Sequence, residues 1–136
     1  MASLTVSGLE DLISDMEAAA NIPDSVAKEM LIKEAGIVEK AHKESIQSKG
    51  LVDSGQLIGS IEADKAPTGR IIEVYPRGIR KDGVRNAEVG FIHEYGAPGR
   101  HIPAKNWMKA ANEGCADKAT DAAFEVYDKF LKSKNL

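Results

Sequence analysis

Residues 24–49 read DSVAKEMLIKEAGIVEKAHKESIQSK, and this stretch decides the N-terminal half of the fold. Its apolar residues recur every three to four positions with charged residues between them, the pattern of a helix with one buried face. Pro23 suits the first turn of that helix and Gly50 its C-terminal cap. The pattern predicts a helix of about 25 residues, about 38 Å long, that packs across a sheet. Its buried stripe would comprise Ala27, Met30, Leu31, Ala35, Val38, Ala41 and Ile46.

Two more helices are predicted, one on each side of the central part of the chain. The first should end near Ala20 with Ser7 as its N-cap, preceded by a short strand or arm at residues 3–6. Its apolar stripe would be Leu9, Leu12, Ile13 and Met16. The last helix should start near Asn106, with basic residues at its C-terminal end. Its stripe would be Trp107, Met108, Ala111, Cys115, Ala119, Ala122, Val126 and Phe130.

The central part carries strand and turn patterns. A helical turn at 57–58, a strand at 60–63, a reverse turn at 66–69 and a β-branched strand at 70–75 predict a hairpin. Residues 77–86 hold four basic side chains, one acid and two glycines, so we expect a mobile basic loop there. A further strand is predicted at 87–92, followed by an irregular segment of about ten residues.

These elements predict an α+β fold in one domain, residues 1–136. A small antiparallel sheet would pack against the long N-terminal helix and the C-terminal helix. The chain has 136 residues, of which 43% are hydrophobic and 29% charged, as in an ordinary globular domain. No internal repeat or long linker divides it.

Composition also limits the classes of function. The formal net charge is −3, from 18 basic and 21 acidic residues, so sequence-specific DNA binding is not expected. A single cysteine, Cys115, cannot form an internal disulfide or a cysteine-cage zinc site. The N-terminus does not resemble a signal peptide, and no apolar run approaches the roughly 18 residues of a membrane span. A reducing cytoplasm fits these features.

The strongest apparent chemical cluster is His93, Glu94 and His101, because imidazole and carboxylate groups are common zinc ligands. Seven residues, with a proline and two glycines among them, separate the two histidines, which is not the spacing of a zincin helix. The alternative is that His93 and Glu94 hold the irregular segment through hydrogen bonds to backbone groups. We favour this alternative over a metal site.

Other chemical signals are weaker. Neither Ser54 nor Ser60 lies in a nucleophile elbow, and Ser54 suits the cap of a helical turn. The glycine-containing stretches 52–55 and 96–99 lack the lysine and spacing of a phosphate loop. No cofactor and no catalytic residue is predicted.

Two surface features could mediate contacts. The basic residues of the loop could meet an acidic surface of a neighbouring subunit, touch DNA phosphates without sequence preference, or remain solvated. These residues are Arg77, Arg80, Lys81 and Arg85. Trp107, Phe91 and Tyr95 could anchor an interface, but in a chain with few aromatic residues we expect them in the core.

Three stretches, taken in order, resemble the tail-completion or head-tail joining proteins of long-tailed bacteriophages. The first is Asp53–Ile61, DSGQLIGSI, similar to the family's Gly-x-Leu-x-x-Ser-Ile pattern. The second is Ala87–Gly96, AEVGFIHEYG, similar to a strand that leads into a Glu-Tyr-Gly turn. The third is His101–Ala110, HIPAKNWMKA, similar to a loop that opens the last helix. Here Lys105 and Asn106 stand where the family commonly has Arg-Pro, and Asn106 could act as an N-cap.

The resemblance implies a structural virion protein, located in the tail or neck and made in the cytoplasm of the host bacterium, and no enzyme. Such a protein would form a ring of about six copies between the head connector and the tail tube or tail terminator, with genomic DNA passing through the centre. Completion, head-closure and terminator roles are all compatible with the resemblance. The motif residues expected to build the platform are Gly55, Leu57, Ser60, Gly90, Glu94, Tyr95, Gly96, Pro103 and Trp107. A metal-dependent hydrolase and a monomeric adaptor that binds a host protein are the alternatives of other classes.

Overall fold

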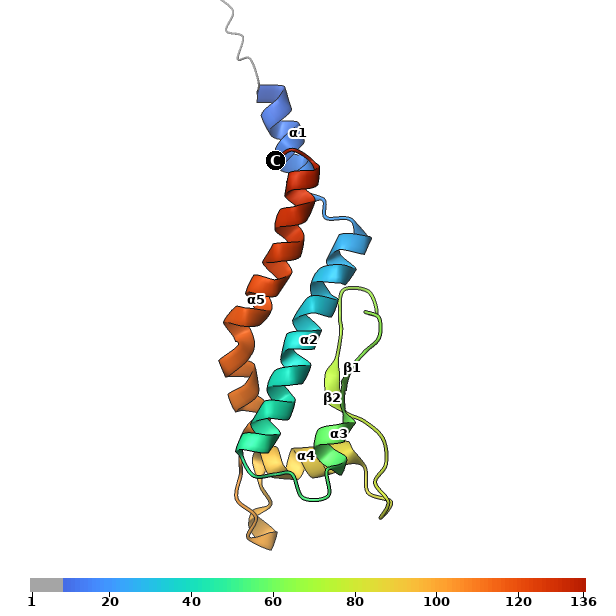
Figure 1. The fold of residues 1–136 in the computed structure, drawn as a ribbon, viewed down its shortest axis with the longest axis vertical. Helices are drawn as coiled ribbons and strands as arrows, with labels where there is room; N and C mark the ends of the chain where they lie inside the picture. The colour runs from blue at the N-terminus through green and yellow to red at the C-terminus, as the bar shows by residue number, and fades with distance from the viewer. Residues whose placement is uncertain (1–8) are drawn as a thin grey trace, which may run out of the picture.

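The computed structural model describes residues 9–136. The predicted arm at 3–6 and the predicted cap Ser7 lie outside these residues. The chain folds into an elongated α+β domain in which two long helices, α2 (Asp24–Ser48) and α5 (Trp107–Ser133), run side by side in opposite directions (Figure 1). The predicted fold class is therefore confirmed, although α2 packs mainly along α5 and contacts the sheet with another part of its surface.

The α2–α5 pair buries part of each predicted stripe, with small side chains at the contact, and leaves Met30, Leu31, Val38, Ala41 and Met108 half-buried. Ala27, Ala35 and Ile46 of α2 are buried. On α5 the buried residues are Trp107, Ala111, Cys115, Ala119, Ala123, Val126 and Phe130. Ala122, predicted in the stripe, is only half-buried, and Ala123, four residues after Ala119, is buried in its place. Because alanine and cysteine dominate this contact, the two helices can approach closely.

The sheet is a single hairpin beside α2. Strands β1 (Ile61–Ala63) and β2 (Val74–Pro76) pair antiparallel with Ile61 opposite Pro76. The short helix α3 (Gln56–Ser60) leads directly into β1. The second strand is shorter than predicted, because residues 70–73 form the irregular end of the hairpin, closed by a bridge between Thr68 and Ile71.

Helix α4 (Asn86–Tyr95) crosses the end of the molecule where α2 ends and α5 begins (Figure 1). The prediction of a strand at 87–92 is wrong. Asn86, Gly90 and Glu94 are buried at four-residue spacing, which places them on one helical face toward the core. A core cluster of Ile46, Leu57, Ile61 and Trp107 fills the space between α2, α3, β1 and α5.

Helix α1 (Leu9–Ala20) lies at the opposite end of the molecule, beyond the C-terminal part of α5 (Figure 1). None of its residues is buried. The predicted helix is confirmed, but its predicted apolar stripe faces solvent. Within residues 9–136, no helix combines the length and the apolar character needed to cross a bilayer.

Candidate functional site

The three motif stretches meet around Trp107, at the end of the molecule that α4 crosses. Trp107 is fully buried, and its indole Nε1 donates a hydrogen bond to the Gly90 carbonyl at 2.9 Å. A Cβ on Gly90 would lie 3.2 Å from the Trp107 ring and 3.4 Å from Leu57, so the indole is seated against a bare helix surface. We call this assembly of α3, α4 and the start of α5 the Trp107 platform.

Glu94 supplies the N-terminal cap of α5. It is buried, and its carboxylate accepts hydrogen bonds from the amides of Met108 at 2.6 Å and Lys109 at 3.0 Å. Asn106 holds the position before the helix at φ 49° but makes no side-chain cap, so the expected cap is replaced by a carboxylate from another helix. A negative charge there also complements the helix dipole. Glu94 thus binds backbone amides, as we expected, but those of α5 and not those of the irregular segment. At His93 it is the backbone carbonyl, and not the side chain, that bonds this segment, through the Lys105 amide.

The segment between α4 and α5 is a tight loop that only glycine can begin. Gly96 has φ 77°, and a Cβ on it would lie 2.8 Å from both the Ala104 amide nitrogen and the Ile102 carbonyl oxygen. Ala97 and Ile102 then exchange hydrogen bonds across a turn that contains Pro98–Arg100. The exposed Pro103 follows this turn. Backbone amide and carbonyl groups of this irregular loop therefore find hydrogen-bond partners within the loop.

The remaining motif residues lie at the edges of the platform. Gly55, at φ 81°, precedes α3, and the Ser60 hydroxyl donates to the Leu57 carbonyl at 2.6 Å. Tyr95 and Phe91 are 64% and 62% exposed, and their rings contact each other at a tilt of 50° with centroids 4.6 Å apart. The prediction that these two aromatic residues belong to the core is wrong, because α4 presents them on the face opposite Gly90.

Two residues of the basic loop are engaged inside the molecule. Arg77 pairs with Asp64 at 2.6 Å and lies over the Tyr75 ring. These two contacts stabilise the hairpin. The pair holds the pKa of Asp64 below its ordinary value, chiefly through the hydrogen bond from Arg77. Arg85 pairs with Glu88 in the first turn of α4 at 2.7 Å. Internal hydrogen bonds order this segment where we expected a mobile loop.

The other two basic residues remain available. The Arg80 guanidinium reaches the Ser54 hydroxyl at 3.4 Å, and the Lys81 side chain is exposed while its amide donates to Gln56. Within residues 9–136, neither Arg80 nor Lys81 lies in an ion pair.

The proposed metal ligands do not converge. In the described part of the chain, no group of three or more histidine, cysteine, aspartate or glutamate side chains is close enough to hold a metal ion. Both carboxylate oxygens of Glu94 are committed to α5. His101 is exposed in the αL conformation at φ 55°. The predicted cluster of His93, Glu94 and His101 is therefore not assembled.

A small cavity of about 50 Å³ does bring together Asp53, Ser54, Arg80 and His93. Partial burial lowers the pKa of His93, and the positive charge of Arg80 lowers it further. Among the described residues no hydrogen bond joins Ser54 to His93, and the cavity has room for about one or two water molecules. It does not have the geometry of a nucleophilic site.

His42 is a buried polar residue that sequence reasoning left out of the core. Its Nε2 lies 2.7 Å from the Asn112 side-chain oxygen, and its ring meets Trp107 edge-on at 5.5 Å. Its position in the sequence could have indicated this burial, because His42 lies four residues before Ile46 on the predicted buried face of α2. The Ser45 hydroxyl, which donates to the Trp107 carbonyl at 2.6 Å, adds a second bond between α2 and α5.

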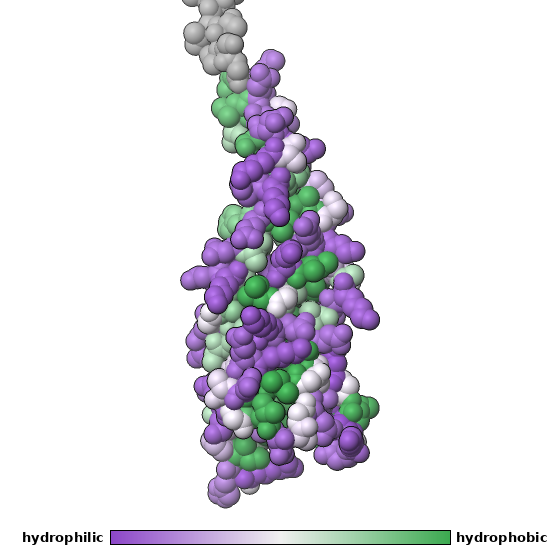
Figure 2. Space-filling view, in the orientation of Figure 1, coloured by the Kyte–Doolittle hydropathy of each residue, from purple (hydrophilic) through white to green (hydrophobic). Residues whose placement is uncertain are grey.

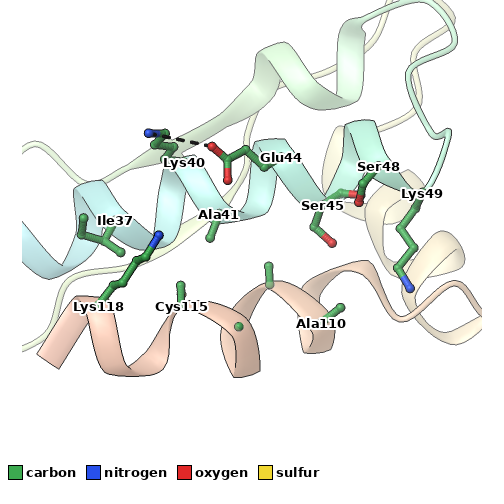
Figure 3. A pocket seen from close by; sticks show the side chains of 12 residues that line it. Ile37, Lys40, Ala41, Glu44, Ser45, Ser48, Lys49, Ala110, Cys115 and Lys118 are labelled. Atoms are coloured by element: carbon green, nitrogen blue, oxygen red, sulfur yellow. Dashed lines mark hydrogen bonds and ion pairs between the residues drawn. The ribbon is translucent and has the colours of Figure 1, made fainter.

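A groove runs between α2 and α5 on the half of the pair nearest the platform (Figure 3). Its volume is about 430 Å³. Small side chains form its floor, and Lys40, Lys49 and Lys118 stand on its rim. We call it the α2–α5 groove. The residues that line it are Ile37, Lys40, Ala41, Glu44, Ser45, Ser48, Lys49, Ala110, Ala111, Gly114, Cys115 and Lys118.

Comparisons with protein-family models, with curated proteins and with solved structures gave no match to this chain.

Proposed function

We propose that this chain is a structural subunit of the neck of a long-tailed bacteriophage, and that it assembles into a ring that joins the head connector to the tail tube. The observation that supports this proposal is the convergence of the three family-like stretches on Trp107. Trp107 of the third stretch bonds to Gly90 of the second and packs in one core cluster with Leu57 of the first. Glu94 of the second stretch accepts hydrogen bonds from Met108 and Lys109 of the third. The resemblance thus concerns residues that form one packed unit.

The exposed apolar surface also favours a subunit over an isolated monomer. Large apolar side chains are exposed at both ends of the molecule, on α1 and on the outer face of α4. Figure 2 shows hydrophobic residues on one flank of the helix next to the grey atoms, and again low on the same face. Apolar surface of this kind is normally covered by a partner. Apolar surfaces on different elements allow heterologous contacts, in which one surface meets a different surface of the next copy, and such contacts can close a ring.

The charge of the chain supports a channel through which DNA passes without binding tightly. The net charge of −3 gives no overall attraction to DNA, and Arg77 and Arg85 are neutralised by acids of their own chain. Arg80 and Lys81 then remain as the side chains of the basic loop that would contact a neighbouring subunit or partner. The protein would act by its geometry, as a completion, head-closure or terminator ring.

The first test is the mass of the purified protein by light scattering at several concentrations, with and without chelator, followed by electron microscopy. Rings of about six copies that chelator does not affect are expected. A strict monomer at every concentration would instead favour the adaptor that binds a host protein. Loss of structure with chelator would favour the metal-dependent hydrolase.

A functional test uses a phage or prophage that carries the gene. Deletion of the gene should yield filled heads and finished tails that do not join, and the purified protein should restore infectious particles when it is added to the lysate. Normal virions from the deletion strain would refute the proposal.

A further inference from the structure

Within residues 9–136, the apolar stripe of α1 is not covered by another part of the chain. Leu12, Ile13 and Met16 are 54%, 48% and 63% exposed. The helix is attached at its last turn, where the Tyr127 hydroxyl donates to the Ala19 carbonyl at 2.9 Å. An amphipathic helix whose stripe faces solvent is the form that docks into an apolar groove.

The charge of α1 specifies what kind of groove would accept it. Its twelve residues, LEDLISDMEAAA, contain four acids and no basic residue. At about 100° per residue, Glu10 and Glu17 lie on one side of the apolar stripe and Asp15 lies on the other. A complementary groove would have an apolar floor between two basic rims.

The α2–α5 groove has this character. Its floor includes Ala111, Gly114 and Cys115, and Gly114 has nothing within 4 Å of the place of a Cβ, so a helix can approach closely. Lys118 stands on the α5 rim; Lys40 and Lys49 stand on the α2 rim (Figure 3). The acid on that rim, Glu44, is 3.9 Å from Lys40 in a pair exposed to solvent, which is weak and easily exchanged.

The lengths also agree. Helix α1 is about 18 Å long, and the part of α2 that lines the groove, from Ile37 to Lys49, also spans about 18 Å. The α1 of the same chain cannot reach it. A turn at 21–23 joins α1 to the start of α2, so a folded-back α1 would cover α2 only to about residue 36.

We propose that α1 of one copy docks in the α2–α5 groove of a second copy. The donor and acceptor surfaces differ, so each copy can give one helix and receive one, and the contact repeats into a ring or a chain. This deepens the proposed function, on which it rests, by naming the interface between ring subunits.

Disulfide trapping in the full-length protein tests this contact. Cys115 is the chain's single cysteine and lines the groove, so Ile13→Cys should form a bond with Cys115 of the next copy under mild oxidation. Because the contact repeats, the products should be a ladder of covalent dimers, trimers and longer species. The matched control is Ser14→Cys, on the opposite side of α1, which should give no ladder.

A second pair of cysteines makes the test independent of the reactivity of the buried Cys115 thiol. In a Cys115→Ala background, Gly114→Cys places a thiol in open space on the same floor. Combined with Ile13→Cys, it should give the ladder; combined with Ser14→Cys, it should not. Lys118→Glu should slow trapping several-fold at low salt, whereas Lys129→Glu, outside the groove, should not.

Every outcome decides the contact. A ladder specific to residue 13 supports it, even if no ring is seen, in which case the ring proposal alone fails. Equal trapping at residues 13 and 14 overturns it. Products that stop at dimers and still form when the groove carries no cysteine also overturn it, because such dimers join α1 of one copy to α1 of another. Absence of a ladder with both cysteine pairs also overturns it; rings that form in that case leave the proposed function intact, and a monomer in that case contradicts both.

Discussion

Removal of the Glu94 carboxylate should destabilise the whole domain, because this one group caps α5 from another helix. Two amides, those of Met108 and Lys109, donate to it at 2.6 and 3.0 Å inside the protein. Hydrogen bonds to a charged group contribute about 1.5–3 kcal/mol each, and loss of an N-cap costs about 0.5–2 kcal/mol. Because these terms overlap, we expect Glu94→Ala to lower the free energy of unfolding by about 2–4 kcal/mol.

The conservative variant separates charge from geometry. Glu94→Gln keeps one acceptor oxygen but turns an amide group toward the second backbone N–H, so its expected loss is about 1–2 kcal/mol. Urea denaturation followed by circular dichroism and by fluorescence measures both variants. Trp107 is the only tryptophan and sits at the capped end, so it reports directly on this region.

An exposed acid on α5, Glu113, provides the control. Its replacement by alanine should change the free energy of unfolding by no more than about 0.5 kcal/mol, as for most surface positions. If Glu94→Ala were as mild as Glu113→Ala, the carboxylate would not cap α5 in solution, and the account of the Trp107 platform would be wrong.

Three further predictions concern the loop, the histidine and the hairpin. Gly96→Ala should cost about 2–4 kcal/mol, whereas Gly99→Ala, with open space around it, should be nearly neutral in the same urea assay; equal effects would contradict the tight loop. His93 has a pKa below its ordinary value, so the folded state binds fewer protons and its contribution to stability falls as the pH drops below about 6.5. NMR titration should show the low pKa, and His93→Gln should flatten this pH dependence; an ordinary pKa would refute the burial argument. Asp64 has a lowered pKa, so its pair with Arg77 stabilises the fold above about pH 4 and is lost as the pH falls further; Asp64→Asn should lower the melting temperature at neutral pH but not in acid, and an equal loss at both pH values would contradict the ion pair.

The sequence by itself determined the elements with long periodic patterns. The helices at Asp24–Ser48 and Trp107–Ser133 and the hairpin order follow from spacing and turn residues, because many positions repeat the same signal. The burial of Trp107 was also predictable from the sequence, since it is large and apolar and lies on the predicted buried stripe of the last helix.

Tertiary structure decided the identity of α4 and the roles of its residues. Val89, Phe91 and Ile92 form a short apolar run that suits a strand as well as a helix, so local propensity could not choose. The spacing of Asn86, Gly90 and Glu94 becomes informative only once Trp107 packs against Gly90 and the start of α5 needs a cap. Contacts between residues distant in the chain therefore override the local strand preference there.

The exposed surfaces were decided in the same way. Periodicity predicts that the α1 stripe and the aromatic residues Phe91 and Tyr95 seek burial, but it does not say against what. The tertiary structure leaves them exposed, since α2 and α5 bury their apolar faces against each other with small side chains at the contact. An amphipathic pattern specifies a face to be buried; only the arrangement of the whole chain specifies whether the partner is internal or another molecule.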